Sequence, residues 1–137
     1  MPSPDTIPGS AAEWLARARG DLALAKAPLP PGAFLDDLCF HAQQAAEKAI
    51  KAVYRHYAWP FRYSHDIDDI LTGLEQHGVA IPPEIREAVV LTDYAAAGRY
   101  PGREEPVTPE EHAAAIALAA RVVAWAAALL AAPASSA

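Results

Sequence analysis

The sequence predicts an all-α protein, folded as an up-and-down bundle of four to five antiparallel helices. Two observations predict this class. Apolar residues recur at helical spacing in several segments, and prolines and glycines stand between those segments. A chain of 137 residues, 53% of them hydrophobic, suits one domain with a substantial core. We expect that domain to span residues 10–132, between a flexible N-terminal lead (1–9) and a frayed C-terminal tail (133–137).

The first two expected helices carry the clearest apolar faces. Ser10 and Glu13 form a capping box at the start of the first helix, which ends before the prolines that begin at Pro28. The second begins within residues 34–37 and runs to about Tyr57. Its apolar face is formed by Cys39, Ala42, Ala46, Ala49, Ile50, Val53 and Tyr57.

Two shorter helices are expected in the middle of the chain. Ser64 is placed to cap the third, whose apolar residues lie within 67–74 and which ends before Gly78. Pro82 and Pro83 open the fourth, which we expect to continue as one helix to about Gly98, with Ile85, Val89, Val90 and Tyr94 as its apolar residues.

The fifth helix begins with a cap, a proline at the first helical position and a capping-box acid, at Thr108, Pro109 and Glu111. It runs to about Ala132. Residues 113–132 are almost wholly apolar, but they are mainly alanine and include Arg121, which costs roughly 2.5 kcal/mol or more near the centre of a bilayer. We therefore expect a buried helix and no membrane association.

Charge and cysteine content restrict the function. The formal net charge is −6, so a nucleic-acid role requires a local gathering of the 11 Lys and Arg residues. The single cysteine, Cys39, excludes an internal disulfide and a zinc site of the CxxC type, and its place on an apolar face predicts an inert buried thiol. Without a recognisable targeting signal, we expect a cytoplasmic protein.

A polar stripe on the second helix is the first candidate site. At 100° per residue, its members fall within a narrow arc opposite the apolar face. One interpretation is a solvated face in which Glu47 pairs with Lys51. The other is a surface that binds phosphate or an acidic partner. The stripe consists of His41, Gln44, Lys48, Lys51 and Arg55.

The second candidate site lies between the fourth and fifth helices. Two guanidinium groups and two phenols stand among glycines there, a combination suited to phosphate and base contacts. The alternative is an ordinary turn whose tyrosines pack on the bundle. The residues are Tyr94, Arg99, Tyr100 and Arg103.

Other chemistry is less well supported. Asp66 and Asp68 have the spacing of a nucleotidyltransferase carboxylate pair, but no Gly-Ser strand precedes them, and acids at a helix start complement the helix dipole. His65 and Asp69 stand four residues apart without a third ligand. We expect no metal and no cofactor.

The second helix resembles that of prokaryotic HEPN domains. An early Trp14, the pair Asp21-Leu22, His65 at the start of the third helix and the turn Arg99-Tyr100-Pro101-Gly102 after Tyr94 agree with the pattern of that family, and the resemblance covers roughly residues 11–130. The run that carries it is Cys39-Phe40-His41-Ala42-Gln43-Gln44-Ala45-Ala46-Glu47-Lys48-Ala49-Ile50-Lys51.

The resemblance implies a bundle of four to five helices that forms a homodimer and that pairs with a minimal nucleotidyltransferase, as a toxin–antitoxin-like or substrate-binding pair. Some relatives are metal-independent ribonucleases. These carry an Arg followed four to six residues later by a His, which hold the phosphate and transfer the proton. No Arg and His in this chain have that spacing.

Two functions follow as hypotheses. The first is a non-catalytic module that binds a nucleotide, RNA or a nucleotidyltransferase partner. The second is a ribonuclease toxin with non-standard spacing, in which folding brings His112 near Arg99 or Arg103. Separately, the aromatic residues Trp59, Phe61, Tyr63 and Tyr100 exceed what one small bundle readily buries, which favours a homodimer.

Overall fold

The computed structural model describes residues 9–61, 64–95 and 106–132, and within these ranges all regular structure is helical. The predicted all-α class is confirmed. The expected lead and tail lie, apart from Gly9, outside the described residues. The elements are α1 (Ala11–Lys26), α2 (Leu35–His56), α3 (Ile67–Gln76), α4 (Pro83–Arg86), the 3₁₀ helix η2 (Glu87–Tyr94) and α5 (Pro109–Ala131).

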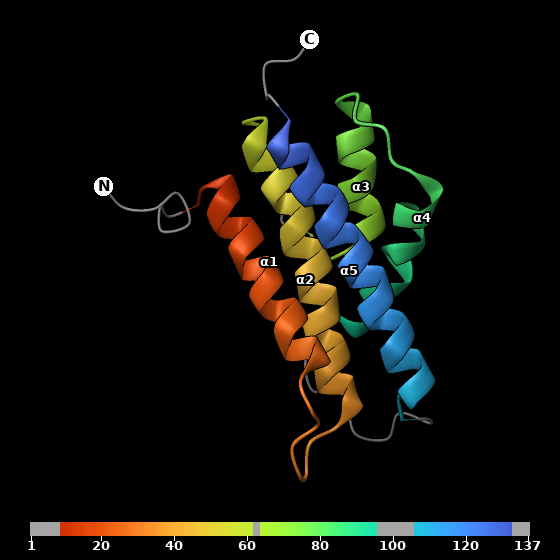
Figure 1. Ribbon diagram of the computed structural model, residues 1–137. Helices are drawn as coiled ribbons and strands as arrows, with labels where there is room; N and C mark the ends of the chain where they lie inside the picture. The colour runs from red at the N-terminus through yellow and green to blue at the C-terminus, as the bar shows by residue number, and fades with distance from the viewer. Residues whose placement is uncertain (1–8, 62–63, 96–105, 133–137) are drawn as a thin grey trace, which may run out of the picture.

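The bundle is built around α2. Figure 1 shows α1 running opposite to α2 and α5, with α2 between them. Six of the seven residues predicted for the apolar face of α2 are completely buried, and Tyr57, just beyond the helix end, is half-buried. Alanines and Cys39 make up most of this face, so neighbouring helices can approach it closely.

The chain between α2 and α3 makes an additional reversal that the sequence did not predict. Ala58, with φ of 59°, turns the chain back, and the NH of Trp59 donates to the carbonyl of Tyr54. The coil of residues 57–66 then runs back along α2, so that the carbonyl of His65 lies 3.4 Å from the amide nitrogen of Gln43. Consequently α3 runs parallel to α2, whereas consecutive helices were mostly expected to be antiparallel (Figure 1).

Two predictions about the middle of the chain were wrong. The N-cap of α3 is Asp66, whose carboxylate accepts from the NH of Asp68, while the Ser64 hydroxyl accepts from the NH of Asp66. The expected fourth helix is a single α-helical turn followed by η2. Its buried residues Ile85, Ala88 and Leu91 repeat every three positions, which matches the three-residue period of a 3₁₀ helix.

The fifth helix begins as predicted. Thr108 and Glu111 form a reciprocal capping box, with hydrogen bonds of 3.0 and 3.1 Å. The expectation of a buried helix holds for one face only. By length and composition the helix could cross a membrane, since its most apolar 18-residue window has a mean hydropathy of 2.0. Only 28% of that window is buried inside the bundle.

The aromatic residues near the end of α2 pack within the monomer. The ring of Trp59 stacks between those of Tyr57 and His77, with centroid distances of 4.5 and 4.2 Å. Phe61 meets Trp14 edge-on at 5.6 Å. The surplus of aromatic surface that favoured a dimer is therefore absent at Trp59 and Phe61, and Tyr63 and Tyr100 lie outside the described residues.

A glycine sets the distance between α2 and α3. The hydroxyl of Tyr54 donates to the carbonyl of Ile70 at 2.7 Å, and it occupies the space that a Cβ on Gly73 would need. Tyr54 is 4% exposed, so it has little freedom to move aside.

We predict that Gly73→Ala destabilises the protein. An alanine in the helix would gain about 1 kcal/mol of helix propensity, but the clash of its Cβ with the Tyr54 hydroxyl costs more than that. Gly20→Ala is the matched control. Gly20 is exposed in α1 with open space around its Cβ position, so this variant should be more stable by about 0.5–1 kcal/mol. Urea denaturation of both variants measures the difference, and equal effects would contradict the packing described.

Candidate functional site

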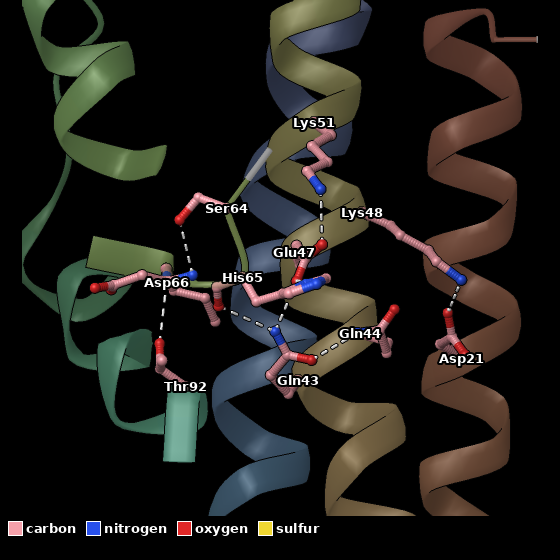
Figure 2. Close-up of polar contacts among 11 residues, drawn as sticks. Asp21, Gln43, Gln44, Glu47, Lys48, Lys51, Ser64, His65, Asp66 and Thr92 are labelled. Carbon is pink, nitrogen blue, oxygen red and sulfur yellow. Dashed lines mark hydrogen bonds and ion pairs between the residues drawn. The ribbon is translucent and has the colours of Figure 1, made fainter. Parts of the chain in front are cut away.

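The predicted polar stripe lies on the part of α2 that faces away from α5. In Figure 2 this surface opens between α1 on one side and the coil before α3 on the other, with α5 behind α2. The stripe is not uniformly solvated. Arg55 is exposed, His41, Gln44 and Lys48 are half-buried, and Lys51 is buried at 7% exposure. Its interpretation as a solvated face is therefore wrong for Lys51.

Glu47 is the centre of a buried hydrogen-bond network. It is 3% exposed, and its carboxylate accepts from Lys51 Nζ at 2.7 Å and from Gln43 Nε2 at 2.8 Å. The Nδ1 atom of His65 lies 2.9 Å away. Because an ionised carboxylate only accepts hydrogen bonds, this contact places the proton on Nδ1. The predicted pairing of Glu47 with Lys51 is confirmed, as a buried ion pair.

These donors determine the charge state of Glu47. Burial alone would raise its pKa, but the hydrogen bonds from Lys51, His65 and Gln43 and the charge of Lys51 together hold the pKa below its ordinary value of 4.5. Glu47 is therefore ionised at neutral pH. A buried carboxylate of this kind stabilises the fold only while its donors remain in place.

Asp21 organises the neighbouring part of the surface. This residue of α1 is 8% exposed, and its carboxylate lies 2.7 Å from Lys48 Nζ and 3.0 Å from His41 Nδ1. Gln44, between these two on α2, donates to Gln43 and so joins the Glu47 network. Each lysine of the stripe thus has a carboxylate partner. The pair of Lys48 and Asp21 ties α1 to α2, and the contact of His65 with Glu47 ties the coil to α2 (Figure 2).

Aromatic rings enclose the far end of the stripe. Lys51 Nζ lies 5.9 and 5.5 Å from the ring centroids of Trp14 and Phe61. The guanidinium carbon of Arg55 lies 4.7 Å from the centroid of Phe61. Such contacts favour a cation over a ring face. Arg55 is exposed and forms no ion pair with the described residues, which leaves its charge available to a ligand.

His65 has the geometry of an oriented, accessible imidazole. Its side chain is 71% exposed, although its Nδ1 is anchored to the buried Glu47. The Nε2 atom, on the other side of the ring, is then the basic nitrogen. Such a nitrogen can accept a hydrogen bond or a proton, and once protonated it can donate to a phosphate oxygen.

The second candidate site is described only in part. Arg99, Tyr100 and Arg103 lie outside the described residues. Tyr94, at the end of η2, is half-buried and lines a hollow of about 260 Å³ against α5, together with Leu91 and Leu118. Its position agrees with the interpretation of a packed tyrosine.

The other candidate groups, His112 and Cys39, are engaged in the packing of the bundle. Nε2 of His112 lies 2.7 Å from the carbonyl of Ala25, to which it donates, so this nitrogen is engaged at the end of α1. Cys39 is completely buried, and burial, followed by the charges of Asp36 and Glu111, raises its pKa to about 11. Among the residues that the structure describes, no three His, Cys, Asp or Glu gather as metal ligands.

The network that connects the stripe to the rest of the bundle was not predicted from the sequence. The sequence did carry a signal for part of it. Polar residues at a spacing of four, which can interact along one side of a helix, occur next to the apolar face at Gln43, Glu47 and Lys51. The approach of His65 had no such signal, since it depends on the path of residues 57–66.

We predict that Glu47→Gln lowers the free energy of unfolding at pH 7 by about 3 kcal/mol, because Lys51 then stays buried without a charged partner. The native protein should lose the stability that the ionised carboxylate of Glu47 contributes as pH falls below 4.5. The folded-state pKa of Glu47 lies under its unfolded value, so the contribution is complete above the unfolded pKa and disappears through the folded one.

Urea titrations between pH 7 and pH 3 measure both effects. Glu75→Gln is the matched control, because Glu75 pairs with Arg86 but its side chain is 52% exposed. That variant should change stability by less than about 0.5 kcal/mol. If Glu47→Gln has an unaltered pH profile, the network does not contribute to stability as described.

Comparison with known proteins agrees with this architecture. The family model of the HEPN domain matches the sequence of residues 11–129. The solved structure of TT1696 from Thermus thermophilus is 32% identical, with a TM-score of 0.76 over 88% of this chain and 98% of that one. ST0689, an archaeal HEPN homologue, is 23% identical with a TM-score of 0.68 over the same shares. Among curated proteins none matches. The chain therefore belongs to the HEPN domain family, a family of nucleotide-binding and ribonuclease-like modules.

Proposed function

We propose that this HEPN protein is a non-catalytic binding module for the phosphate groups of a nucleotide or of RNA, and that it binds them at the α2 face between α1 and His65. We further propose that it acts in the cytoplasm as the accessory subunit of a minimal nucleotidyltransferase, in a toxin–antitoxin-like pair. The observation that supports phosphate binding is the exposed imidazole of His65, which Glu47 anchors at the face of α2 that also carries Gln44 and Lys48 (Figure 2).

The donors on this face are fixed before any ligand arrives. Glu47 orients His65, and Asp21 holds Lys48 with its side chain 29% exposed. Preorganised donors lose little conformational entropy on binding. Because Glu47 and Asp21 balance the two lysine charges, attraction at long range is weak, and affinity must come from short hydrogen bonds and from Arg55.

The positions of the histidines favour a module without catalytic activity. The ribonuclease spacing of Arg and His is absent from the sequence, and His112 already donates from Nε2 to the carbonyl of Ala25. Its ring is therefore held by the bundle. The nucleotidyltransferase chemistry would be supplied by the partner, since Asp66 and Asp68 belong to the first turn of α3, where Asp66 is the cap.

We predict that His65→Ala and Lys48→Met each weaken nucleotide binding about tenfold, which corresponds to about 1.4 kcal/mol and to the loss of one charge-assisted hydrogen bond. Titration calorimetry with ATP, and with a short single-stranded RNA, measures this. Lys26→Met, which removes an exposed cation from the last turn of α1, is the control and should leave the affinity within twofold. Equal losses in all three variants would show only a general charge effect.

The nucleotidyltransferase partnership has a separate test. The tagged protein, recovered from its own cells, should bring with it a small nucleotidyltransferase that carries the Gly-Ser and Asp-x-Asp motifs, and the RNA in the sample should be intact. Trimmed RNA in the absence of such a partner would contradict the accessory role.

A metal-independent ribonuclease is the second candidate, and the pair of Glu47 and His65 is the observation that favours it. A buried carboxylate that orients an exposed imidazole is the arrangement of a general base. We nevertheless predict that purified protein leaves RNA intact in EDTA. Cleavage that disappears in His65→Ala, His112→Ala or Arg99→Ala would establish the enzyme instead.

A further inference from the structure

An apolar groove lies between α1 and α5, at the end of the bundle where α1 begins and α5 ends (Figure 1). Its volume is about 390 Å³, which lies within the range of about 300–1,000 Å³ that is usual for small-molecule sites. Leu15 lines it from α1 and Leu130 from α5, and alanines of these two helices supply most of the remaining wall. The groove therefore suits the apolar part of a small ligand.

An exposed cation borders this groove. Arg19 lines it and forms no ion pair with the residues that the structure describes. Arg17, on the same helix, is engaged, since its guanidinium lies 3.7 Å from the carboxylate of Glu13. Among the described residues that line the groove, none is acidic. In a chain with a net charge of −6 this is a local positive site, so it favours an anionic ligand.

His56, the last residue of α2, is the other polar side chain in the wall. Its Nε2 atom is buried and forms no hydrogen bond within the described part of the chain, although buried nitrogen atoms normally have a partner. The ring is held by packing, edge-on to Tyr57 at a centroid distance of 4.9 Å. A small rotation of the ring toward the groove would let Nε2 donate to a ligand oxygen, so the groove favours an oxygen-bearing occupant over a wholly apolar one.

We propose that this groove binds the anion of a medium-chain fatty acid, with its carboxylate between Arg19 and His56 and its alkyl chain against Leu15 and Leu130. A guanidinium group binds a carboxylate through two parallel hydrogen bonds. The alkyl chain gains free energy by leaving water for the apolar wall. Both parts of the ligand are therefore needed, and the site goes beyond the proposed binding of phosphate groups.

The directions of the helices bring the two polar side chains together. Side chains of a helix lean toward its N-terminus, and α1 and α2 run in opposite directions (Figure 1). Arg19 on α1 and His56 on α2 thus lean toward each other along the same groove. The polar face of α2 is turned away from α5, whereas this groove is lined by α5, so the two proposed sites are separate.

Titration calorimetry with octanoate, kept below its micelle concentration, tests the proposal. We expect one site per chain with a Kd below about 1 mM. Acetate lacks the chain and 1-octanol lacks the charge, and each should bind at least about tenfold more weakly, because each forms only one of the two interactions.

Two pairs of variants test the site. Arg19→Gln should weaken octanoate binding about tenfold, and Arg17→Gln is the matched control, an exposed cation of α1 outside the groove that should stay within about twofold. Ala127→Leu fills the groove at a half-buried position and should weaken binding by about tenfold or more. Ala128→Leu, exposed and outside the groove, is its control. Circular dichroism should show all four variants folded.

The ¹H–¹³C signals of the imidazole rings locate the ligand. Octanoate should shift the signals of His56, which a His56→Phe variant assigns, because this ring lines the groove. The signals of His65 should not move, since its ring is anchored at the polar face of α2.

Absence of binding, equal affinity for octanoate and 1-octanol, or an unaltered affinity in Arg19→Gln would each overturn the proposal. Shifts at His65 in place of His56 would also overturn it, by placing the anion at the proposed phosphate site. The nucleotide affinity of Arg19→Gln is measured separately and should be unchanged, so the groove and the proposed binding function can fail independently.

Discussion

The arrangement of this bundle depends on one buried carboxylate. Glu47 lies in the middle of α2 at 3% exposure, where an unpaired charge would cost several kcal/mol. Two of its donors come from α2 itself, one turn away on either side. The third comes from His65, and it reaches Glu47 only if residues 57–66 run back along the helix. Satisfying this charge therefore goes together with the chain reversal at Ala58 and with the parallel direction of α3.

The same requirement explains why the polar face of α2 is ordered rather than loosely solvated. Asp21 ties Lys48 to α1, while Glu47 pairs with Lys51 within α2 and holds the coil to α2 through His65. This face lies on the opposite side of α2 from α5, as Figure 2 shows.

Local signals in the sequence were sufficient for most of the fold. Ser10 and Thr108 are the N-caps of α1 and α5, as predicted, although only Thr108 has a reciprocal capping box, since the Glu13 carboxylate accepts from the NH of Gly9 and not from that of Ser10. The helical apolar spacing in α2 correctly predicted its buried face. Both act within a few residues, so no knowledge of the tertiary structure was needed. The family resemblance rested on the same helix. The prediction of an α-helix through Val89 and Val90 was wrong, because buried residues there recur every three positions rather than with the α-helical period of 3.6.

The site was less predictable, because its geometry depends on contacts between segments distant in sequence. Helical periodicity placed the members of the stripe on one arc, but it could not show that Lys51 would be covered by Trp14 and Phe61. Nor could it bring His65 to Glu47, eighteen positions away. Exposure depends on which neighbours cover a helix, whereas periodicity reports only which residues share a face.

The tautomer of His65 is the most direct test of the central role given to Glu47. A long-range ¹H–¹⁵N correlation spectrum of the neutral ring distinguishes the protonated ring nitrogen from the basic one. A proton on Nδ1, with Nε2 as the basic nitrogen, is the predicted result, and Glu47→Gln should alter it. A proton on Nε2 in the native protein would contradict the account, because Nδ1 could then donate nothing to the Glu47 carboxylate.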